Sequence, residues 1–209
     1  MTMNIDLFQP DFVIDCADLK NSKDIYEVMR SKHIVESYVY AMINHPKRLI
    51  NKFIKVGMSN PDIVDTTRET SVGERITRQA AWLLGWPEGQ AESTHGEDFW
   101  VNMEKSGLFP NFNKNDLRIA VWDITARMPT SDMMSESIAS KWAEGELAKQ
   151  HKQHFKCLPP LNFADPSRCA AQKGTVSATC FHNHFDIVNA ESLKIKHKAK
   201  IRSGYNILS

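Results

Sequence analysis

The chain has 209 residues, of which 42% are hydrophobic and 24% charged, a composition typical of a globular protein with a packed core. Its 26 Lys and Arg residues nearly balance its 25 Asp and Glu residues, so attraction to nucleic acid must come from local concentrations of charge and not from the net charge. Four cysteines are too few for a disulfide scaffold, no apolar run reaches the ~20 residues of a membrane span, and the N-terminus lacks a signal-peptide pattern, so we expect a cytoplasmic protein without membrane contact.

The first half of the chain is predicted to form an extension followed by a hairpin. Residues 1–36 are expected to be an N-terminal extension with one helix over 18–33, where apolar residues have helical spacing. Residues 37–43 and 53–58 are rich in β-formers and flank a basic, turn-prone insert, which predicts the two strands of a β-hairpin. Residues 60–72 are polar, begin with Asn-Pro and are predicted to be a loop.

The second half completes a small mixed unit. A helix is predicted over 73–84, a third strand over 117–124 and a long helix over 134–155. Together with the hairpin, these elements give the order β-β-α-β-α. We therefore predict an α+β fold, with a small three-stranded, mainly antiparallel sheet flanked by helices. Its core domain spans 37–162 and is followed by a basic C-terminal segment, 163–209.

The predicted hairpin carries two short motifs. The sequence YVY at 38–40 lies on the first strand, and KVG at 55–57 lies on the second. In this order they resemble the two motifs of the GIY-YIG nuclease superfamily. Lys55 stands where most members have a tyrosine, a departure shared by a subset with KIG-like motifs. The resemblance implies that Tyr40 is catalytic, with Tyr38 as a second candidate, and that Lys55 assists it.

A helix after the hairpin extends the resemblance. GERI at 73–76 is similar to the family segment whose arginine faces the hairpin, which implies a phosphate-binding role for Arg75. Arg78 lies three residues further on, on nearly the same helix face, and remains the alternative. Gln79 stands where many members have a histidine or a tyrosine.

The last predicted helix of the core carries the acidic part of the resemblance. EGELAKQH at 144–151 is similar to the family segment with a metal-binding glutamate, a leucine three residues later and a lysine five residues later. This spacing implies Glu144 as the metal ligand. Glu146 is the competitor, on a different face of the helix. The following LPPLN, which ends at Asn162, resembles the segment that closes the family's core domain.

The resemblance implies a metal-dependent endonuclease that hydrolyses DNA phosphodiester bonds. The implied cofactor is Mg²⁺ or Mn²⁺, the partner is double-stranded DNA, and the role is phage or bacterial restriction or defence in the cytoplasm of a bacterial or phage-infected host cell. An enzyme that cuts palindromes would act as a two-fold homodimer. The alternative is a non-cleaving nucleic-acid-binding or adaptor protein on the same fold.

Each implied residue type suits its role. The carboxylate of Glu144 suits a hard, oxygen-liganded Mg²⁺ that keeps most of its waters. The planar fork of Arg75 matches two phosphate oxygens. Tyr40 would activate a water if its pKa, ordinarily about 10, is lowered, and we expect a neighbouring Lys55 ammonium to lower it.

The C-terminal segment contains a group of zinc-ligand types, namely Cys169, Cys180, His182 and His184. Their C-x10-C-x-H-x-H spacing is not that of a familiar zinc finger. Buried cysteines with loop histidines are therefore the alternative to a Zn²⁺ site.

The end of the chain alternates cationic and apolar residues with a period of two. The cationic residues, which would share one face of a strand, are Lys194, Lys196, Lys198, Lys200 and Arg202. Such a strip suits contacts with DNA phosphates, or a dimer contact. The alternative is a solvated edge strand whose lysines prevent aggregation.

Overall fold

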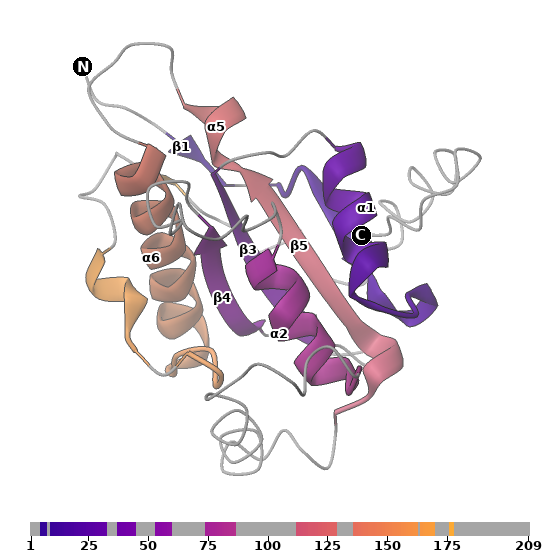
Figure 1. The fold of residues 1–209 in the computed structure, drawn as a ribbon. Coiled ribbons are helices and arrows are strands. Elements are labelled where there is room, and N and C mark those ends of the chain that lie inside the picture. Colours follow the sequence, from indigo (N-terminus) through magenta and orange to yellow (C-terminus); the bar gives the residue numbers. More distant parts are fainter. Residues whose placement is uncertain are drawn as a thin grey trace.

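The computed structural model describes residues 5–7, 9–32, 37–44, 53–59, 74–86, 112–128, 136–162, 164–169 and 176–177. Within these residues, an antiparallel sheet contains four strands in the order β2-β5-β3-β4 (Figure 1). These strands are β2 (Phe12–Asp15), β3 (Tyr38–Asn44), β4 (Phe53–Ser59) and β5 (Leu117–Asp123). A separate parallel pair consists of β1 (Ile5–Asp6) and β6 (Val176–Ser177).

The predicted hairpin is formed by β3 and β4. In its register, Tyr40 lies opposite Gly57, and Met42 lies opposite Lys55. Because opposite residues of an antiparallel pair share a face of the sheet, all four side-chain positions lie on the same face. Strand β3 also pairs with β5, so β3 is a central strand of the sheet and its first six residues are buried.

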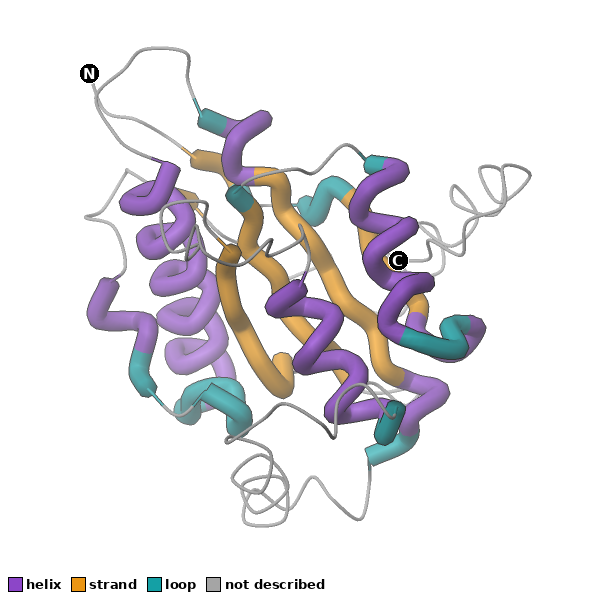
Figure 2. The backbone as a smooth tube through the Cα atoms, in the orientation of Figure 1, coloured by secondary structure: helices purple, strands orange, loops and turns teal. Residues whose placement is uncertain are grey.

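Helices cover both faces of the sheet. Helices α1 (Ser22–Ser31) and α2 (Glu74–Leu84) pack on the face that carries Tyr40 and share one apolar cluster with it. Helices α5 (Ile124–Arg127) and α6 (Glu136–Phe155) contribute to the cluster on the other face. Figure 2 shows α6 beside the β4 edge of the sheet. None of the described helices combines the length and the apolar character needed to cross a membrane.

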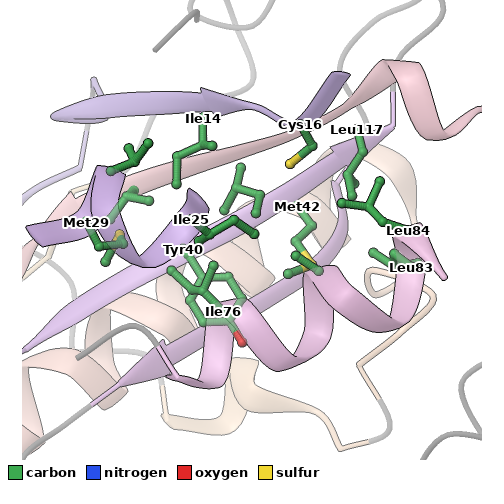
Figure 3. Close-up of a cluster of buried hydrophobic side chains, with 14 of the residues drawn as sticks. Ile14, Cys16, Ile25, Met29, Tyr40, Met42, Ile76, Leu83, Leu84 and Leu117 are labelled. Atoms are coloured by element: carbon green, nitrogen blue, oxygen red, sulfur yellow. The ribbon is translucent and has the colours of Figure 1, made fainter. Parts of the chain in front are cut away.

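The cluster on the Tyr40 face fixes the position of α2. Figure 3 shows Tyr40 and Met42 from β3 beside Ile76 and Leu83 from α2, with Ile25 of α1 close by. All five side chains are at most 1% exposed. Their burial provides the main free-energy gain for holding this helix against the hairpin, about 1.5 to 3 kcal/mol for each large apolar side chain.

The α+β class is confirmed, and the described sheet has one strand more than predicted. The extra strand is β2, which lies in the predicted N-terminal extension and pairs antiparallel with β5. Phe12, Val13 and Ile14 are all buried, because both faces of this strand are covered. The predicted helix over 18–33 is present as α1. Its first turn is fixed by a capping box between Asn21 and Asp24.

Candidate active site

Tyr40 lies at the centre of the candidate site, under α2. Its side chain is fully buried, and its hydroxyl donates a 2.5 Å hydrogen bond to Oε1 of Gln79. Across the hairpin, a Cβ atom at Gly57 would collide with the Tyr40 hydroxyl and the adjoining ring carbons. Glycine at this position therefore lets the tyrosine ring lie over β4 and reach α2.

Lys55 lies on the same face of the hairpin, two residue pairs along from Tyr40 and Gly57. Its Nζ donates a 3.0 Å hydrogen bond to the carbonyl oxygen of Leu161. Burial lowers the pKa of Lys55 from 10.5 to about 8; the positive charge of Arg75 also lowers it, and the carboxylate of Glu144 raises it. Both the ammonium and the free amine are therefore populated close to neutral pH.

The segment that follows α6 is bound to the outer edge of β4. The side-chain Oδ1 of Asn162 accepts a 2.8 Å hydrogen bond from the Val56 N–H, and its Nδ2 donates a 2.9 Å bond to the Val56 carbonyl. The Leu161 N–H donates to the Ile54 carbonyl at 2.9 Å. These three bonds place the Leu161 carbonyl beside Lys55.

Arg75 connects α2 to the hairpin and to the charged groups of the site. Its side chain is exposed, and Nη1 donates a 3.3 Å hydrogen bond to the Met58 carbonyl at the end of β4. Its charge lowers the pKa of Tyr40, of Lys55 and of Glu144. Of the two arginines that the sequence offered as candidates, Arg75 is therefore the one whose charge acts on all three groups. Arg78 is half-buried on the same helix.

Of the two candidate glutamates, Glu144 faces the cluster. It is half-buried on α6; burial raises its pKa, and the charges of Arg75 and Lys55 act in the opposite direction. Glu146 is only 4% exposed and accepts hydrogen bonds from Lys149 at 3.0 Å and Gln150 at 2.9 Å on its own helix.

Four predicted residues from four elements therefore form one electrostatic cluster: Tyr40 on β3, Lys55 on β4, Arg75 on α2 and Glu144 on α6. The charge of Arg75 acts on the pKa of Tyr40, Lys55 and Glu144, which requires groups that are close together in a medium less polarisable than water. The cluster combines two cations, one carboxylate and a buried phenol, a set that can bind a phosphate and a hydrated divalent cation.

The expected effect of Lys55 on Tyr40 is wrong. Burial raises the pKa of Tyr40 above its ordinary value, and the nearby positive charge that opposes this effect is Arg75. The physical reason is that the phenol is enclosed between the sheet and α2, where a phenolate would lose its hydration. The ammonium of Lys55 is directed to the Leu161 carbonyl. Tyr40 therefore stays a protonated phenol.

Tyr38, the second candidate tyrosine, is also buried. Its ring centroid lies 6.2 Å from that of Tyr40, and its charge, if ionised, would raise the pKa of Tyr40 further. Gln79, in contrast, contacts the Tyr40 hydroxyl directly and was not among the predicted site residues. Its sequence signal is the four-residue spacing from Arg75, which places both residues on one face of α2.

The predicted C-terminal sites fall almost entirely outside the described residues. This applies to Cys180, His182 and His184, and to all five cationic residues of the strip, Lys194, Lys196, Lys198, Lys200 and Arg202. Cys169 is described and is an exposed free thiol at the end of the short helix η5 (Pro166–Cys169). Across the described part of the chain, no group of three or more His, Cys, Asp or Glu residues is arranged to hold a metal ion.

No protein-family model, curated protein or solved structure matches the chain.

Proposed function

We propose that this protein is a Mg²⁺-dependent endonuclease of the GIY-YIG type that hydrolyses phosphodiester bonds of double-stranded DNA. The observation that carries the proposal is that Arg75 of α2 bonds to the end of the hairpin strand that carries Lys55, and that its charge acts on Tyr40, Lys55 and Glu144, which lie on separate elements. A structural ion pair needs one acid and one base. Here the charges of two basic residues act on a single carboxylate, and a buried phenol belongs to the same group, a set that suits phosphodiester hydrolysis.

Arg75 is the group that binds the scissile phosphate. Its guanidinium is exposed, and the 3.3 Å hydrogen bond from Nη1 to the Met58 carbonyl anchors it to β4. A guanidinium presents five N–H donors, so donors remain for two phosphate oxygens after this contact. The positive charge of Arg75 also favours an anionic ligand.

Glu144 is the group that would hold the metal. It supplies one carboxylate, which suits a Mg²⁺ that keeps most of its waters and takes a phosphate oxygen as a further ligand. Because burial raises the pKa of Glu144, a cation beside it would favour the ionised form. When bound, the metal supplies Lewis-acid stabilisation of the negative charge that develops on the phosphate.

Tyr40 and Lys55 act on the attacking water. Tyr40 is fully buried, so a water at its oxygen would need further polar partners, and we assign this part to Lys55 and Glu144, the other members of the cluster that could act on a water. The water oxygen forms a bond to phosphorus while the bond from phosphorus to the leaving oxygen breaks. The free amine of Lys55 takes the proton of the water, and solvent protonates the leaving oxygen.

The wider biological assignment is part of the proposal. The cationic strip Lys194, Lys196, Lys198, Lys200 and Arg202 would bind the DNA backbone. A two-fold homodimer would present two such sites to a palindrome. The setting is restriction or defence in the cytoplasm of a bacterial or phage-infected cell.

A plasmid-nicking assay with supercoiled DNA and Mg²⁺ tests the proposal. We expect the wild-type protein to nick or cut the plasmid, and Glu144→Gln to lower the rate by about 100-fold or more, since it removes the metal ligand. Glu146→Gln is the matched control on the same helix and should keep most of the activity. Circular dichroism verifies that both variants are folded.

The same assay separates the alternative function. A non-cleaving nucleic-acid-binding or adaptor protein would retard DNA in a gel-shift experiment but leave the plasmid intact with Mg²⁺ and with Mn²⁺. Cleavage that Glu144→Gln leaves at the wild-type rate would contradict the assigned site.

A further inference from the structure

We propose that Gln79 is a positioning residue that fixes the phenol proton of Tyr40, so that Tyr40 orients the attacking water through its oxygen lone pairs and does not take a proton from it. This inference rests on the proposed nuclease function and assigns a task to a residue outside the four-residue cluster.

The hydrogen bond between the two side chains is the first observation. Tyr40 donates its single O–H to Oε1 of Gln79 over 2.5 Å, a short distance for a bond between neutral groups. An amide oxygen is a good acceptor but a very weak base. Gln79 therefore holds the proton on the tyrosine and cannot relay it elsewhere.

The surroundings of the tyrosine are the second observation. Figure 3 shows the Tyr40 ring in the apolar cluster beside Ile76 of α2. Gly57, which lies opposite Tyr40 on β4, has no side chain that could accept the proton in place of Gln79. Within the described part of the chain, the hydroxyl donates to Gln79, which comes from the helix that also carries Arg75.

The orientation of the proton has a chemical consequence. With its O–H committed to Gln79, the phenol oxygen presents only lone pairs to its remaining surroundings. It can then accept a hydrogen bond from a water and hold that water in one orientation, while Lys55 remains the acceptor of the proton. Such orientation lowers the entropic part of the barrier.

The test uses full-length protein with ¹³C at Cζ of its tyrosines, of which the sequence has four. The Tyr40→Phe variant identifies the Tyr40 resonance, whose position reports how strongly the phenol donates. We expect Gln79→Met to shift this resonance upfield, because it removes the acceptor at nearly constant side-chain length. Gln79→Glu, which keeps an oxygen acceptor, should leave it in place or shift it downfield. Gln153→Met, at an exposed glutamine of α6, is the control and should change nothing.

Kinetics supply the second readout. We expect Gln79→Met to lower kcat for plasmid nicking by about 10- to 100-fold with little change in KM, as for a lost orientation of reacting groups. Combined with Tyr40→Phe, it should cause no further loss, because both changes remove the same interaction. An unshifted Tyr40 resonance in Gln79→Met, or losses that multiply in the double variant, would overturn the inference. If the wild-type protein cleaves no DNA, the proposed function fails, and the NMR comparison alone then decides whether Gln79 fixes the phenol proton.

Discussion

Lys55 Nζ donates a 3.0 Å hydrogen bond to the carbonyl oxygen of Leu161, a residue 106 positions later in the chain. The bond joins the second strand of the hairpin to the segment that follows the last long helix. Asn162 holds that segment in place through two hydrogen bonds with Val56, the residue directly after Lys55. The position of the lysine amine in the site therefore depends on an asparagine that is itself outside the electrostatic cluster.

Asn162→Ala is expected to destabilise the protein and to weaken the site. It removes both bonds to Val56, each with a net contribution of about 1 kcal/mol, so the free energy of unfolding should fall by about 2 kcal/mol. Asn162→Asp keeps the acceptor for the Val56 N–H but sets a carboxylate oxygen against the Val56 carbonyl, so it should destabilise the protein at least as much. Urea denaturation followed by tryptophan fluorescence measures both values. Equal stability of Asn162→Ala and the wild type would show that the bonds do not hold the segment on β4.

The hairpin that carries Tyr40 and Lys55 could be predicted from the sequence alone. Side chains along a β-strand point to alternate faces, so every second residue shares a face. Once a hairpin is assumed, this alternation indicates which residues of YVY and KVG lie on the same face. The structure places Tyr40 opposite Gly57 and Lys55 opposite Met42, on one face as this repeat requires. The pairing of β2 with β5 was not predicted, because a four-residue strand separated from its partner by a hundred residues has no local signal.

The choice between paired candidates on the helices required tertiary packing. Arg75 and Arg78 lie on nearly the same face of α2, and the rotation of that helix is set by the burial of Ile76 and its neighbours in the core. On α6, the burial of Leu147 against the sheet fixes which glutamate reaches the cluster. The raised pKa of Tyr40 could not be predicted either, since it depends on how completely α2 encloses the ring.

The buried amine of Lys55 predicts a pH dependence of stability in metal-free protein. The folded-state pKa is about 8 against 10.5 for a free lysine. Between these two values the unfolded chain binds more protons than the folded protein, so stability rises with pH through this window, by at most about 1.4 kcal/mol per pH unit. Below about pH 8 the amine is protonated in the folded protein as well, and the free energy of unfolding is lowered by the full cost of the buried ammonium.

Comparison with Lys55→Met isolates this contribution, because all other titrating groups are common to the two proteins. We expect the free energy of unfolding of the wild type, relative to Lys55→Met, to increase from pH 7 to pH 10 in buffer with EDTA. The charged groups around the amine are Arg75 from α2 and Glu144 from α6. Lys141→Met, at an exposed lysine of α6, corrects for the loss of one surface lysine. A difference that is flat or falls with pH would contradict the lowered pKa.

Arg75→Lys is expected to separate phosphate binding from simple charge. The ammonium keeps the positive charge that acts on Tyr40, Lys55 and Glu144 but loses the planar fork. Plasmid nicking should fall by about 10- to 100-fold, because a bidentate contact with the phosphate becomes monodentate. Arg78→Lys on the same helix is the control, and we expect it to stay within about threefold of the wild type. A larger loss for Arg78→Lys than for Arg75→Lys would reverse the assignment.

Gly57→Ala is expected to damage the site by displacing Tyr40. The added methyl group would overlap the tyrosine hydroxyl and ring. Because the backbone of β4 is held in the sheet, the ring must move away from Gln79. Overpacking of this kind costs about 1 to 3 kcal/mol of stability. Ser59→Ala, two residues further along the same face of β4, introduces no overlap and serves as the control.

A double-mutant cycle identifies the collision as the cause. Tyr40→Leu shortens the side chain that meets the new methyl group, so Gly57→Ala should destabilise a Tyr40→Leu protein by clearly less than it destabilises the wild type. We expect a coupling energy of about 1 kcal/mol or more, since the two residues are in direct contact. Unfolding free energies of the four proteins in urea give this value. Additive effects would mean that Gly57 is required for the backbone of β4 and not for the approach of Tyr40 to α2.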